Sequence, residues 1–405
     1  MHTRIAILIL IVACACAEDW PQFLGPARNG VYSGADLATA WVPAGPAVVW
    51  KKDVGQGFSA PVVAQGRLIL FHRAGDKEVI EALDAATGKP IWKFDYPTSY
   101  RDDFGFDEGP RAAPAIAGGR VYTFGAEGSL HCLDFNTGKK IWSVDTHATF
   151  RVRKGYFGAA CSPLVDEGRV LMNIGGSSGA GLVAFDAANG KTLWKATDQE
   201  ASYSSPVVAN IDGVRHALFF TRAGLVDADP ATGKVRYQFP WRARMQASVN
   251  AAAPIVVGDL VFLSSSYGTG AVLLQVGAGG LKQVWSSDDA LTNHYATSVY
   301  KDGFLYGYHG RQEEGPSLRC VEFKTGKVRW NVDGFRAGSI TLAGGRLLIQ
   351  REGGELVLAE ASPAAYKVIS TAKPLPGTVR SYPAISNGRY YVRNEKTLIC
   401  LNLSK

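Results

Sequence analysis

Short apolar runs separated by turn residues recur along the whole chain in a fixed order. A run of a small residue, proline and aliphatic residues comes first. A Gly turn and an alternating run such as "GGRVYTFG" follow, then a run that ends at an acid, and finally a run that begins at an aromatic. Four short strands in every 40–50 residues, joined by turns, are typical of one blade of a β-propeller. The proline runs are "SAPVV" at 59–63, "AAPAI" at 112–116, "CSPLV" at 161–165, "SSPVV" at 204–208, "AAPIV" at 252–256 and "SYPAI" at 381–385.

The turn between the last two runs of each unit has its own motif. "DAATGKPIW" at 84–92 returns as "DFNTGKKIW" at 134–142, "DAANGKTLW" at 186–194, "DPATGKVRY" at 229–237 and "EFKTGKVRW" at 322–330. The acid can accept backbone N–H bonds of the tight turn, and the Gly supplies a positive φ. The aromatic starts the outermost strand, where we expect it to lie across the seam with the next blade.

Counting these aromatics gives the number of blades. Consecutive aromatics are 42 to 52 residues apart, and a degenerate copy, "AAYKVIS" at 364–370, supplies an eighth unit. The pattern predicts an all-β, eight-bladed propeller of four-stranded antiparallel blades. The predicted seam residues are Trp50, Trp92, Trp142, Trp194, Tyr237, Trp285 and Trp330.

The two ends of the repeat predict how the ring closes. "TLICLNL" at 397–403 is a third strand with no fourth strand after it, and "PAVVWKKDV" at 46–54 is a fourth strand with no third strand before it. We therefore expect the N- and C-terminal strands to complete one blade together. The propeller then spans residues 46–405.

Residues 1–45 divide into a leader and a strap. Arg4, the apolar run "IAILILIVA" and Ala15-Cys16-Ala17 predict a signal peptide at 1–17, hence an exported, periplasmic or extracellular protein. A lipobox-like reading, in which Cys14 is lipidated, is the alternative. Residues 18–45 are expected to strap onto the ring through "DWPQF" at 19–23, with a partner-binding tail as the alternative. The remaining sequence contains no apolar stretch of about 18 residues, so no transmembrane segment is expected.

The charge and cysteine content of the chain reduce the number of function classes to be considered. The net charge is +7, and the basic residues are spread along the chain, so we expect no nucleic-acid binding. We expect a monomer. Cysteines outside the leader lie far apart in apolar runs, which favours free buried thiols, and no C-x-x-C metal or haem motif occurs. These are Cys132, Cys161, Cys320 and Cys400.

Candidate site residues lie in the loops that enter the innermost strands, because these loops converge on the propeller axis. The two longest are residues 96–111, with Asp107, Glu108 and Arg111, and residues 145–160, with Tyr156. One loop is acidic and the other basic. They either form a polar pocket or pair with each other across the seam.

Residues 288–298 bring Asn293, His294 and Tyr295 to the same end. His294 could act as a base or a ligand, but no second ligand stands nearby in the sequence, which favours a structural histidine. Arg336 and Arg380 enter the last two blades as Arg111 enters an earlier one, so the three predict a positive throat for a carboxylate or an acidic peptide. No catalytic residue and no metal ligand is assigned.

The Thr-Gly-Lys and Trp repeat, with "DWPQFLGPARNGVYSG" at 19–34, resembles the exported bacterial proteins called PQQ-binding-like β-propeller repeat proteins. Within this fold, quinoprotein alcohol dehydrogenases hold the quinone on the axis with an adjacent Cys pair, a Trp, a calcium ion and an Asp base. This chain has no adjacent Cys pair and is shorter than those enzymes. It is more similar to the propeller of the outer-membrane assembly machine, a docking platform without a cofactor.

The resemblance therefore implies an exported, non-catalytic scaffold that presents axial loops to a protein or cell-envelope component. No cofactor is expected on this interpretation. The alternative is a dehydrogenase of alcohols or sugars that uses pyrroloquinoline quinone with Ca²⁺. A lyase or hydrolase that uses the axial carboxylates is a third possibility.

Overall fold

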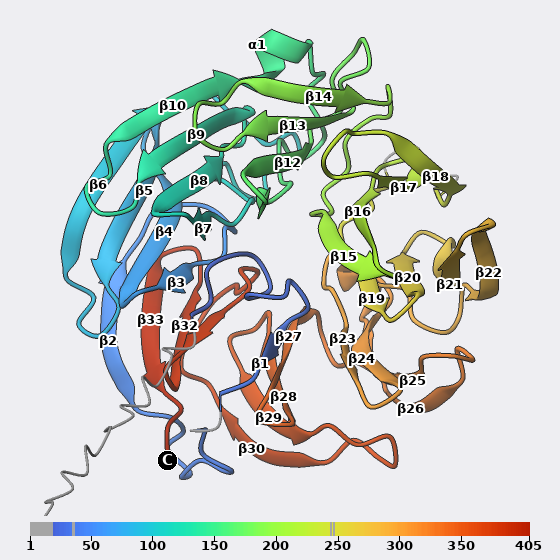
Figure 1. Ribbon diagram of the computed structural model, residues 1–405. Coiled ribbons are helices and arrows are strands. Elements are labelled where there is room, and N and C mark those ends of the chain that lie inside the picture. Colours follow the sequence, from blue (N-terminus) through green and yellow to red (C-terminus); the bar gives the residue numbers. More distant parts are fainter. Residues whose placement is uncertain (1–18, 35–36, 244, 246–247) are drawn as a thin grey trace, which may run out of the picture.

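Eight twisted sheets surround a central axis in the computed structural model, which describes residues 19–34, 37–243, 245 and 248–405 (Figure 1). Each sheet runs outward from a short inner strand to a solvent-facing outer strand. The predicted all-β, eight-bladed propeller of four-stranded antiparallel sheets is confirmed. The leader expected at 1–17, with Cys14, lies outside the described residues.

The first four blades follow one another in the chain, each from inner to outer strand. Blade 1 comprises β3 (Val62–Ala64), β4 (Arg67–Ala74), β5 (Lys77–Asp84) and β6 (Pro90–Pro97). Blade 2 comprises β7 (Ala115–Ala117), β8 (Arg120–Phe124), β9 (Ser129–Asp134) and β10 (Lys140–Asp145). Blade 3 comprises β11 (Leu164–Asp166), β12 (Arg169–Asn173), β13 (Leu182–Asp186) and β14 (Thr192–Ala196). Blade 4 comprises β15 (Val207–Ile211), β16 (Val214–Phe220), β17 (Gly224–Ala228) and β18 (Val235–Pro240).

The other four blades complete the ring. Blade 5 comprises β19 (Ile255–Val257), β20 (Leu260–Ser265), β21 (Gly270–Gly277) and β22 (Gly280–Ser287). Blade 6 comprises β23 (Val299–Lys301), β24 (Phe304–His309), β25 (Ser317–Glu322) and β26 (Val328–Val332). Blade 7 comprises β27 (Gly338–Ala343), β28 (Arg346–Arg351), β29 (Leu356–Glu360) and β30 (Val368–Ala372). Blade 8 comprises β31 (Ala384–Ser386), β32 (Arg389–Arg393), β33 (Thr397–Asn402) and β2 (Val48–Asp53).

The ring closes through blade 8, as the sequence predicts. Strand β2 pairs antiparallel with β33, and Trp50 lies opposite Cys400. The first and last parts of the propeller therefore share one sheet, which leaves no unpaired blade at either end of the repeat.

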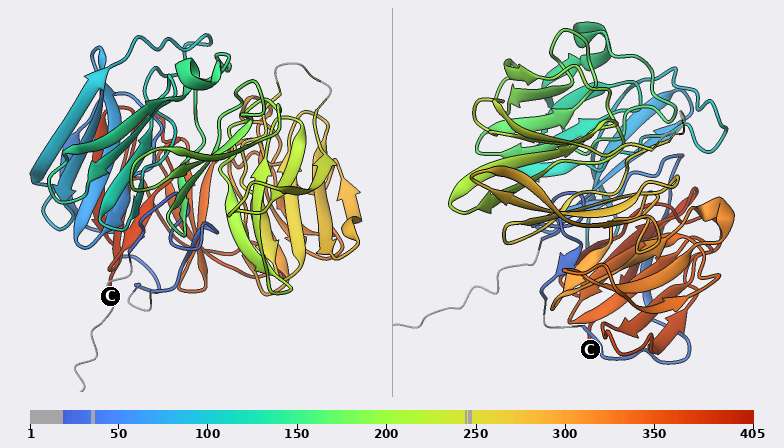
Figure 2. Two further views of the ribbon diagram at one scale, coloured as in Figure 1. Left: turned by 45° about the horizontal axis from the view of Figure 1, so that its top comes forward. Right: turned by 90° about the vertical axis from the view of Figure 1, so that its right-hand side faces the viewer.

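The segment before β2 crosses one end of the ring. Trp20 forms a two-way backbone bridge with Val63 of β3, and the carbonyl of Pro21 accepts the N–H of Ile116 of β7. Strand β1 (Val31–Tyr32) then pairs parallel with β27 on the inner edge of blade 7. In the left view of Figure 2 this segment lies at the end opposite to α1 (Thr146–Phe150) and the connection from β6 to β7. The described part of the strap thus closes one end of the axis.

Every seam between blades that carries the predicted aromatic contains the same hydrogen bond. The Trp or Tyr donates to a carbonyl in the next blade, at the end of that blade's third strand or within two residues after it, at 2.9–3.1 Å. Burying a large ring whose polar atom is satisfied is a strong way to join two sheets. The pairs are Trp50 with Ala85, Trp92 with Phe135, Trp142 with Ala187, Trp194 with Pro230, Tyr237 with Gly277, Trp285 with Phe323 and Trp330 with Ser362.

The motif glycine is needed for two reasons. Gly138 has φ +69°, and a Cβ at this position would lie 2.5 Å from the indole of Trp92 in the preceding blade. The turn is held by Asp134, whose Oδ1 accepts the N–H and the hydroxyl of Thr137 at 2.8 and 2.7 Å. A side chain on the glycine would therefore strain the turn and displace the neighbouring blade's aromatic.

Blade 7 carries the degenerate copy of the motif, and its seam is built differently. Ser370 stands opposite Leu358, at the register position that Trp92 occupies opposite Ala82 in blade 1. The N–H of Trp41, from the strap, donates to the Ser370 hydroxyl at 3.0 Å, and Trp41 packs against the adjoining core. The N-terminal segment supplies the aromatic ring that this blade lacks.

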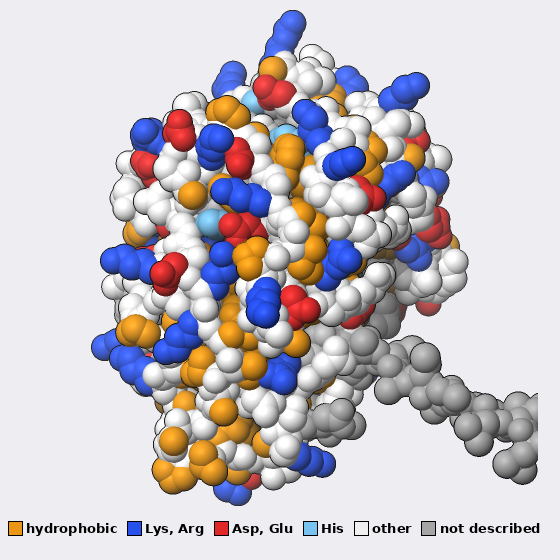
Figure 3. Space-filling model, turned by 90° about the vertical axis from the view of Figure 1, so that its left-hand side faces the viewer, with side chains coloured by type: hydrophobic (Ala, Val, Ile, Leu, Met, Phe, Trp, Pro, Cys, Tyr) orange, Lys and Arg blue, Asp and Glu red, His pale blue; other side chains and the backbone are white. Residues whose placement is uncertain are grey.

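The outer edge of the ring is mixed in character. A β-bulge in β10 turns the seam aromatic inward and leaves the preceding apolar residue in solvent: Trp142 is 8% exposed and Ile141 is 43% exposed. On the face shown in Figure 3, Lys and Arg side chains are scattered among acidic and apolar ones rather than gathered in one patch. Within the described part of the chain, no helix is long and apolar enough to cross a membrane. The four cysteines in that part are free and buried.

We expect Trp142→Ala to lower the free energy of unfolding by about 3–5 kcal/mol, because it empties a buried seam. The matched control is Ile141→Ala, one residue earlier in the same strand, which should change stability by less than about 0.5 kcal/mol because its side chain is exposed. Urea denaturation followed by circular dichroism measures both. Equal effects would contradict the role of the seam.

A buried carboxyl group also links blades 1 and 2. Glu78 of β5 is 1% exposed, accepts a hydrogen bond from the N–H of Ala126 at 2.9 Å, and is bonded to the hydroxyl of Tyr96. Burial raises the pKa of Glu78 above its ordinary value of 4.5. The folded protein therefore binds a proton at this group more tightly than the unfolded chain does.

The stability that Glu78 contributes should be fully present below pH 4.5 and should fall as the pH rises through its raised pKa. Glu78→Gln keeps a neutral group of the same shape, so the unfolding free energy of this variant should show less decline between pH 4.5 and neutrality. Glu360→Gln, at an exposed carboxylate paired with Lys367, is the control and should keep the wild-type pH profile. An unchanged profile in Glu78→Gln would refute the assignment.

Candidate functional site

Hydroxyl groups next to the repeated prolines tie the inner ends of the blades together. The N–H of Ala113 donates to Oγ of Ser162 at 2.9 Å, and the N–H of Ser162 donates to Oγ of Ser205 at 2.9 Å. Farther around the ring, the N–H of Ala253 donates to Oγ1 of Thr297 at 2.9 Å. This chain of bonds explains why small residues precede the prolines, since a larger side chain would separate the entry loops.

Above this layer lies a cavity of about 360 Å³ on the axis, which we call the funnel. In six blades the funnel is lined by the residue three positions before the repeated proline, because each entry segment presents the same position to the axis. These residues are Phe58, Arg111, Ala160, Tyr203, Ala251 and Arg380. Phe23 of the strap also lines the funnel and packs edge-on against Tyr382, with ring centroids 5.1 Å apart.

Two arginines flank one aromatic ring in this cavity. The guanidinium carbons of Arg111 and Arg380 each lie 5.6 Å from the centroid of Phe58. Arg111 pairs with Asp102 at 3.2 Å, and Arg380 pairs with Glu352. Since each cation already has an acidic partner, the funnel is predominantly aromatic and carries little unpaired positive charge.

The connection from β6 to β7 is held in shape by one carboxylate. Asp102 has a fully buried side chain whose Oδ2 accepts the N–H groups of Phe106 and Asp107 at 2.8 and 3.1 Å, in addition to Arg111. The loop that it organises carries Phe104 and Phe106, which are 52% and 42% exposed and line the funnel mouth. Two large apolar side chains are thus held in solvent by a rigid loop.

His294 and Tyr295 line the opposite wall of the funnel. Nε2 of His294 lies 2.8 Å from the hydroxyl of Tyr267, and burial lowers the pKa of His294 to about 4. The imidazole is therefore neutral near pH 7. Burial raises the pKa of Tyr295.

Other candidate residues have structural contacts. The side chain of Asn293 bonds to the carbonyl of Tyr308 at 2.8 Å and to the hydroxyl of Ser298 at 3.1 Å. Asp107 is buried and caps the N–H of Gly109, while Glu108 pairs with Arg101 at 3.2 Å. None of these three lines the funnel.

Arg336 also lies outside the funnel lining. Blade 7 has no proline at the start of its inner strand, and β27 begins at Gly338, earlier in the repeat than the other inner strands. Arg336 has φ +63°, so its backbone turns differently from those of Arg111 and Arg380, and its side chain is exposed. The structure brings two of the three predicted arginines together.

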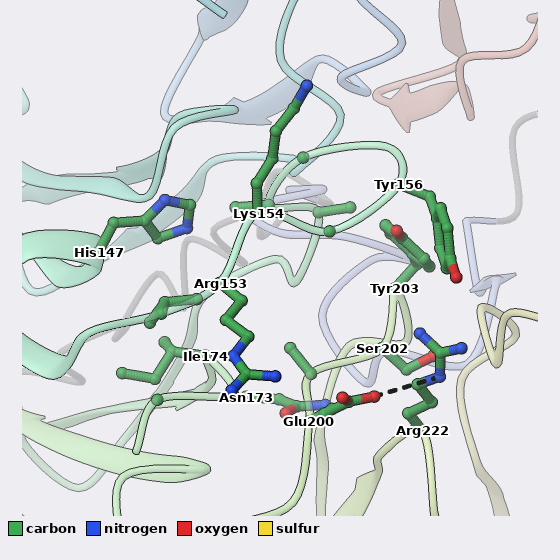
Figure 4. Close-up of a pocket in the computed structure, with 18 of the residues that line it drawn as sticks. His147, Arg153, Lys154, Tyr156, Asn173, Ile174, Glu200, Ser202, Tyr203 and Arg222 are labelled. Carbon is green, nitrogen blue, oxygen red and sulfur yellow. Dashed lines mark ion pairs between the residues drawn. The ribbon is translucent and has the colours of Figure 1, made fainter. Parts of the chain in front are cut away.

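Tyr156 lies in a second cavity, of about 530 Å³, beside the funnel (Figure 4). We call it the side cavity; Tyr203 and Ala160 line both. Lys154 of the basic loop pairs with Asp103 of the acidic loop across the seam. Asp102 and Glu108 instead pair with arginines of their own loop, Arg111 and Arg101. The pair of Lys154 and Asp103 follows the alternative in which the loops pair across the seam, whereas no residue of 96–111 lines the side cavity.

Sequence reasoning missed most of the aromatic lining of the funnel. Phe58 and Tyr203 carry a usable signal, because they stand three residues before a repeat proline, as Arg111 and Arg380 do. Phe104, Phe106 and Phe157 lie in irregular loops that no repeat position marks.

The described residues contain no group of three or more His, Cys, Asp or Glu side chains placed to hold a metal ion. Ca²⁺ takes six to eight oxygen ligands, usually with several carboxylates. Among the described residues, Glu313 is the one carboxylate residue in the funnel lining, and it pairs with Arg311 at 3.4 Å. The aromatic rings suit a planar ligand, but this donor set does not fit a calcium-bound quinone.

A family model described as outer membrane protein assembly factor BamB matches residues 27–99 and 75–332. The quinohemoprotein alcohol dehydrogenase ADH-IIG of Pseudomonas putida is 34% identical over 152 residues, a match that covers 36% of this chain and 20% of that enzyme. The chain therefore matches about a fifth of the length of this curated relative.

Solved structures of both kinds share the fold. BamB from Moraxella catarrhalis superposes with a TM-score of 0.63 at 16% identity, over 87% of this chain and 96% of that one. The quinohemoprotein alcohol dehydrogenase from Comamonas testosteroni superposes with a TM-score of 0.69 at 15% identity, over 96% of this chain and 81% of that one. At these identities the likeness concerns the fold alone.

Proposed function

The chain belongs to the family described as outer membrane protein assembly factor BamB, and on that premise we propose that it is an exported, non-catalytic binding protein of the cell envelope. Its funnel receives an apolar side chain from a segment of a partner protein. Export rests on the leader-like residues 1–17, and the envelope location rests on the family description.

The observation that carries the proposal is the exposed aromatic mouth of the funnel. Phe104 and Phe106 stand in solvent on a loop that Asp102 holds rigid, and Arg380 lies 5.0 Å from the Phe106 ring centroid. Aromatic residues and arginine are enriched at the energetic centres of protein interfaces. A pre-formed, partly apolar cavity of this kind loses little conformational entropy when it binds a partner.

A photo-crosslinking residue at position 104 should capture a partner in cells, and the same residue at position 91 should not. Ile91 is the matched control because it is 44% exposed but lies on the outer edge, in β6. The captured protein is then purified for binding measurements with the wild-type chain and with the variants.

We expect the Phe104→Ala/Phe106→Ala double variant to bind the captured partner at least about tenfold more weakly, the loss typical of a truncated interface anchor. Ile91→Ala should bind within about twofold of wild type. Equal crosslinking from both positions, or an unchanged affinity of the double variant, would refute the proposal.

A quinone-dependent dehydrogenase is the second candidate, favoured by the local match to the Pseudomonas putida enzyme. The funnel supplies aromatic faces for a planar ring, but a single carboxylate residue, Glu313, in its lining. We expect titration with pyrroloquinoline quinone and Ca²⁺ to give no stoichiometric complex and no dye reduction with alcohols. Tight one-to-one binding with turnover would reverse the preference between the two candidates.

A further inference from the structure

The side cavity is built from three connections that meet beside blade 3. They are the segment after α1, the hairpin between β12 and β13, and the entry to blade 4. At about 530 Å³ it is larger than the funnel, and Figure 4 shows charged and polar side chains on several of its walls. The volume suits an organic molecule of one or two rings rather than a single ion.

Asn173 is the most informative residue in this cavity. It is 2% exposed, lies at the end of β12, and both polar atoms of its side chain, Oδ1 and Nδ2, are buried without a hydrogen-bond partner. An unsatisfied buried polar group destabilises a folded protein, because it has lost its hydrogen bonds to water and gained none in return. Both atoms are shielded within the cavity wall, so a ligand with a neighbouring donor and acceptor would satisfy them once the Asn173 side chain rotates toward the cavity that it lines.

A second feature is an arginine that is not neutralised. Lys154 pairs with Asp103, and Arg222 pairs with Glu200 at 3.3 Å. Among the described residues Arg153 forms no ion pair, and its exposed side chain lines the same cavity as Asn173 (Figure 4). A guanidinium binds planar acidic groups such as a carboxylate through two parallel hydrogen bonds.

The wall farther from Arg153 is aromatic. Tyr156 and Tyr203 lie together on that side in Figure 4, with Arg222 below them. The hydroxyl of Tyr203 already accepts the N–H of Phe157 at 3.0 Å, so its ring is held in place. Apolar ring faces combined with a few fixed polar groups are typical of small-molecule sites.

We propose that the side cavity binds an acidic sugar of the hexuronate class. The sugar carboxylate pairs with Arg153, adjacent ring hydroxyls donate to Oδ1 and accept from Nδ2 of Asn173, and the C–H face of the ring packs toward Tyr156 and Tyr203. This site is separate from the aromatic mouth of the funnel, so either assignment can fail without the other.

Calorimetric titration of the mature protein with glucuronate tests the proposal, with glucose and acetate as probes that lack the carboxylate and the hydroxyls. Glucuronate is expected to bind at least tenfold more tightly than either probe. Arg153→Gln should weaken binding at least tenfold, and Arg336→Gln, at an exposed arginine outside the cavity, should leave it unchanged.

The Asn173→Leu variant distinguishes a role of the amide in ligand binding from a role in folding. If the amide serves a ligand, this variant loses glucuronate binding while its melting temperature stays equal to or rises above that of wild type, because two unsatisfied buried atoms have been removed. A clear drop in melting temperature would mean that the amide serves the fold, and this outcome would overturn the assignment. Three other results would also overturn the assignment. They are no binding of glucuronate to the wild type, glucuronate binding by Asn173→Leu at the wild-type affinity, and binding of acetate as tight as that of glucuronate.

Discussion

The rest of this structure depends on one contact, the indole of one blade packed over the Thr-Gly-Lys turn of the next. The ring N–H donates to the first carbonyl after the third strand, and the motif glycine leaves room for the ring, as Trp92 and Gly138 illustrate. The hydrogen bond of the ring, the burial of the ring and the absence of a Cβ on the glycine act together. Each copy of the motif therefore fixes both its own turn and the position of the aromatic in the preceding blade. A single blade cannot bury both faces, and this contact makes eight of them interdependent.

Two parts of the chain outside the regular repeat complete that ring. Blade 8 is assembled from both ends of the propeller, and the strap closes one end of the axis through the bridge of Trp20 and the pairing of β1. The strap also brings Trp41 to Ser370, where blade 7 lacks its own aromatic. The N-terminal segment therefore supports the ring at its weakest repeat and leaves the opposite end of the axis open to a ligand.

Both cavities lie at that open end, and they differ in chemistry. The funnel is aromatic, and its cations Arg111 and Arg380 are already paired with acids. The side cavity holds an arginine without an ion pair and a buried amide without a partner. The first is suited to an apolar anchor from a protein and the second to a small polar acid. Such different sites can stand side by side because the ring positions the entry loops of neighbouring blades next to each other.

By itself the sequence determined the architecture: the strand pattern, the blade count, the closure and the turn chemistry all follow from local periodicity, because similar local physics recurs from blade to blade. It also located part of the funnel, since residues at one phase of the repeat, such as Arg111 and Arg380, face the axis alike. Only the tertiary structure showed which residues depart from the position that the repeat predicts for them. Arg336 leaves the funnel because β27 begins earlier in the repeat than the other inner strands and because the backbone turns at Arg336, with φ +63°. Asn173 sits in a glycine-rich hairpin with no distinguishing motif, and its amide lacks partners only because loops from blades 2 and 4 enclose it without reaching it. Pairings between irregular loops depend on distances across the ring, which no local pattern encodes.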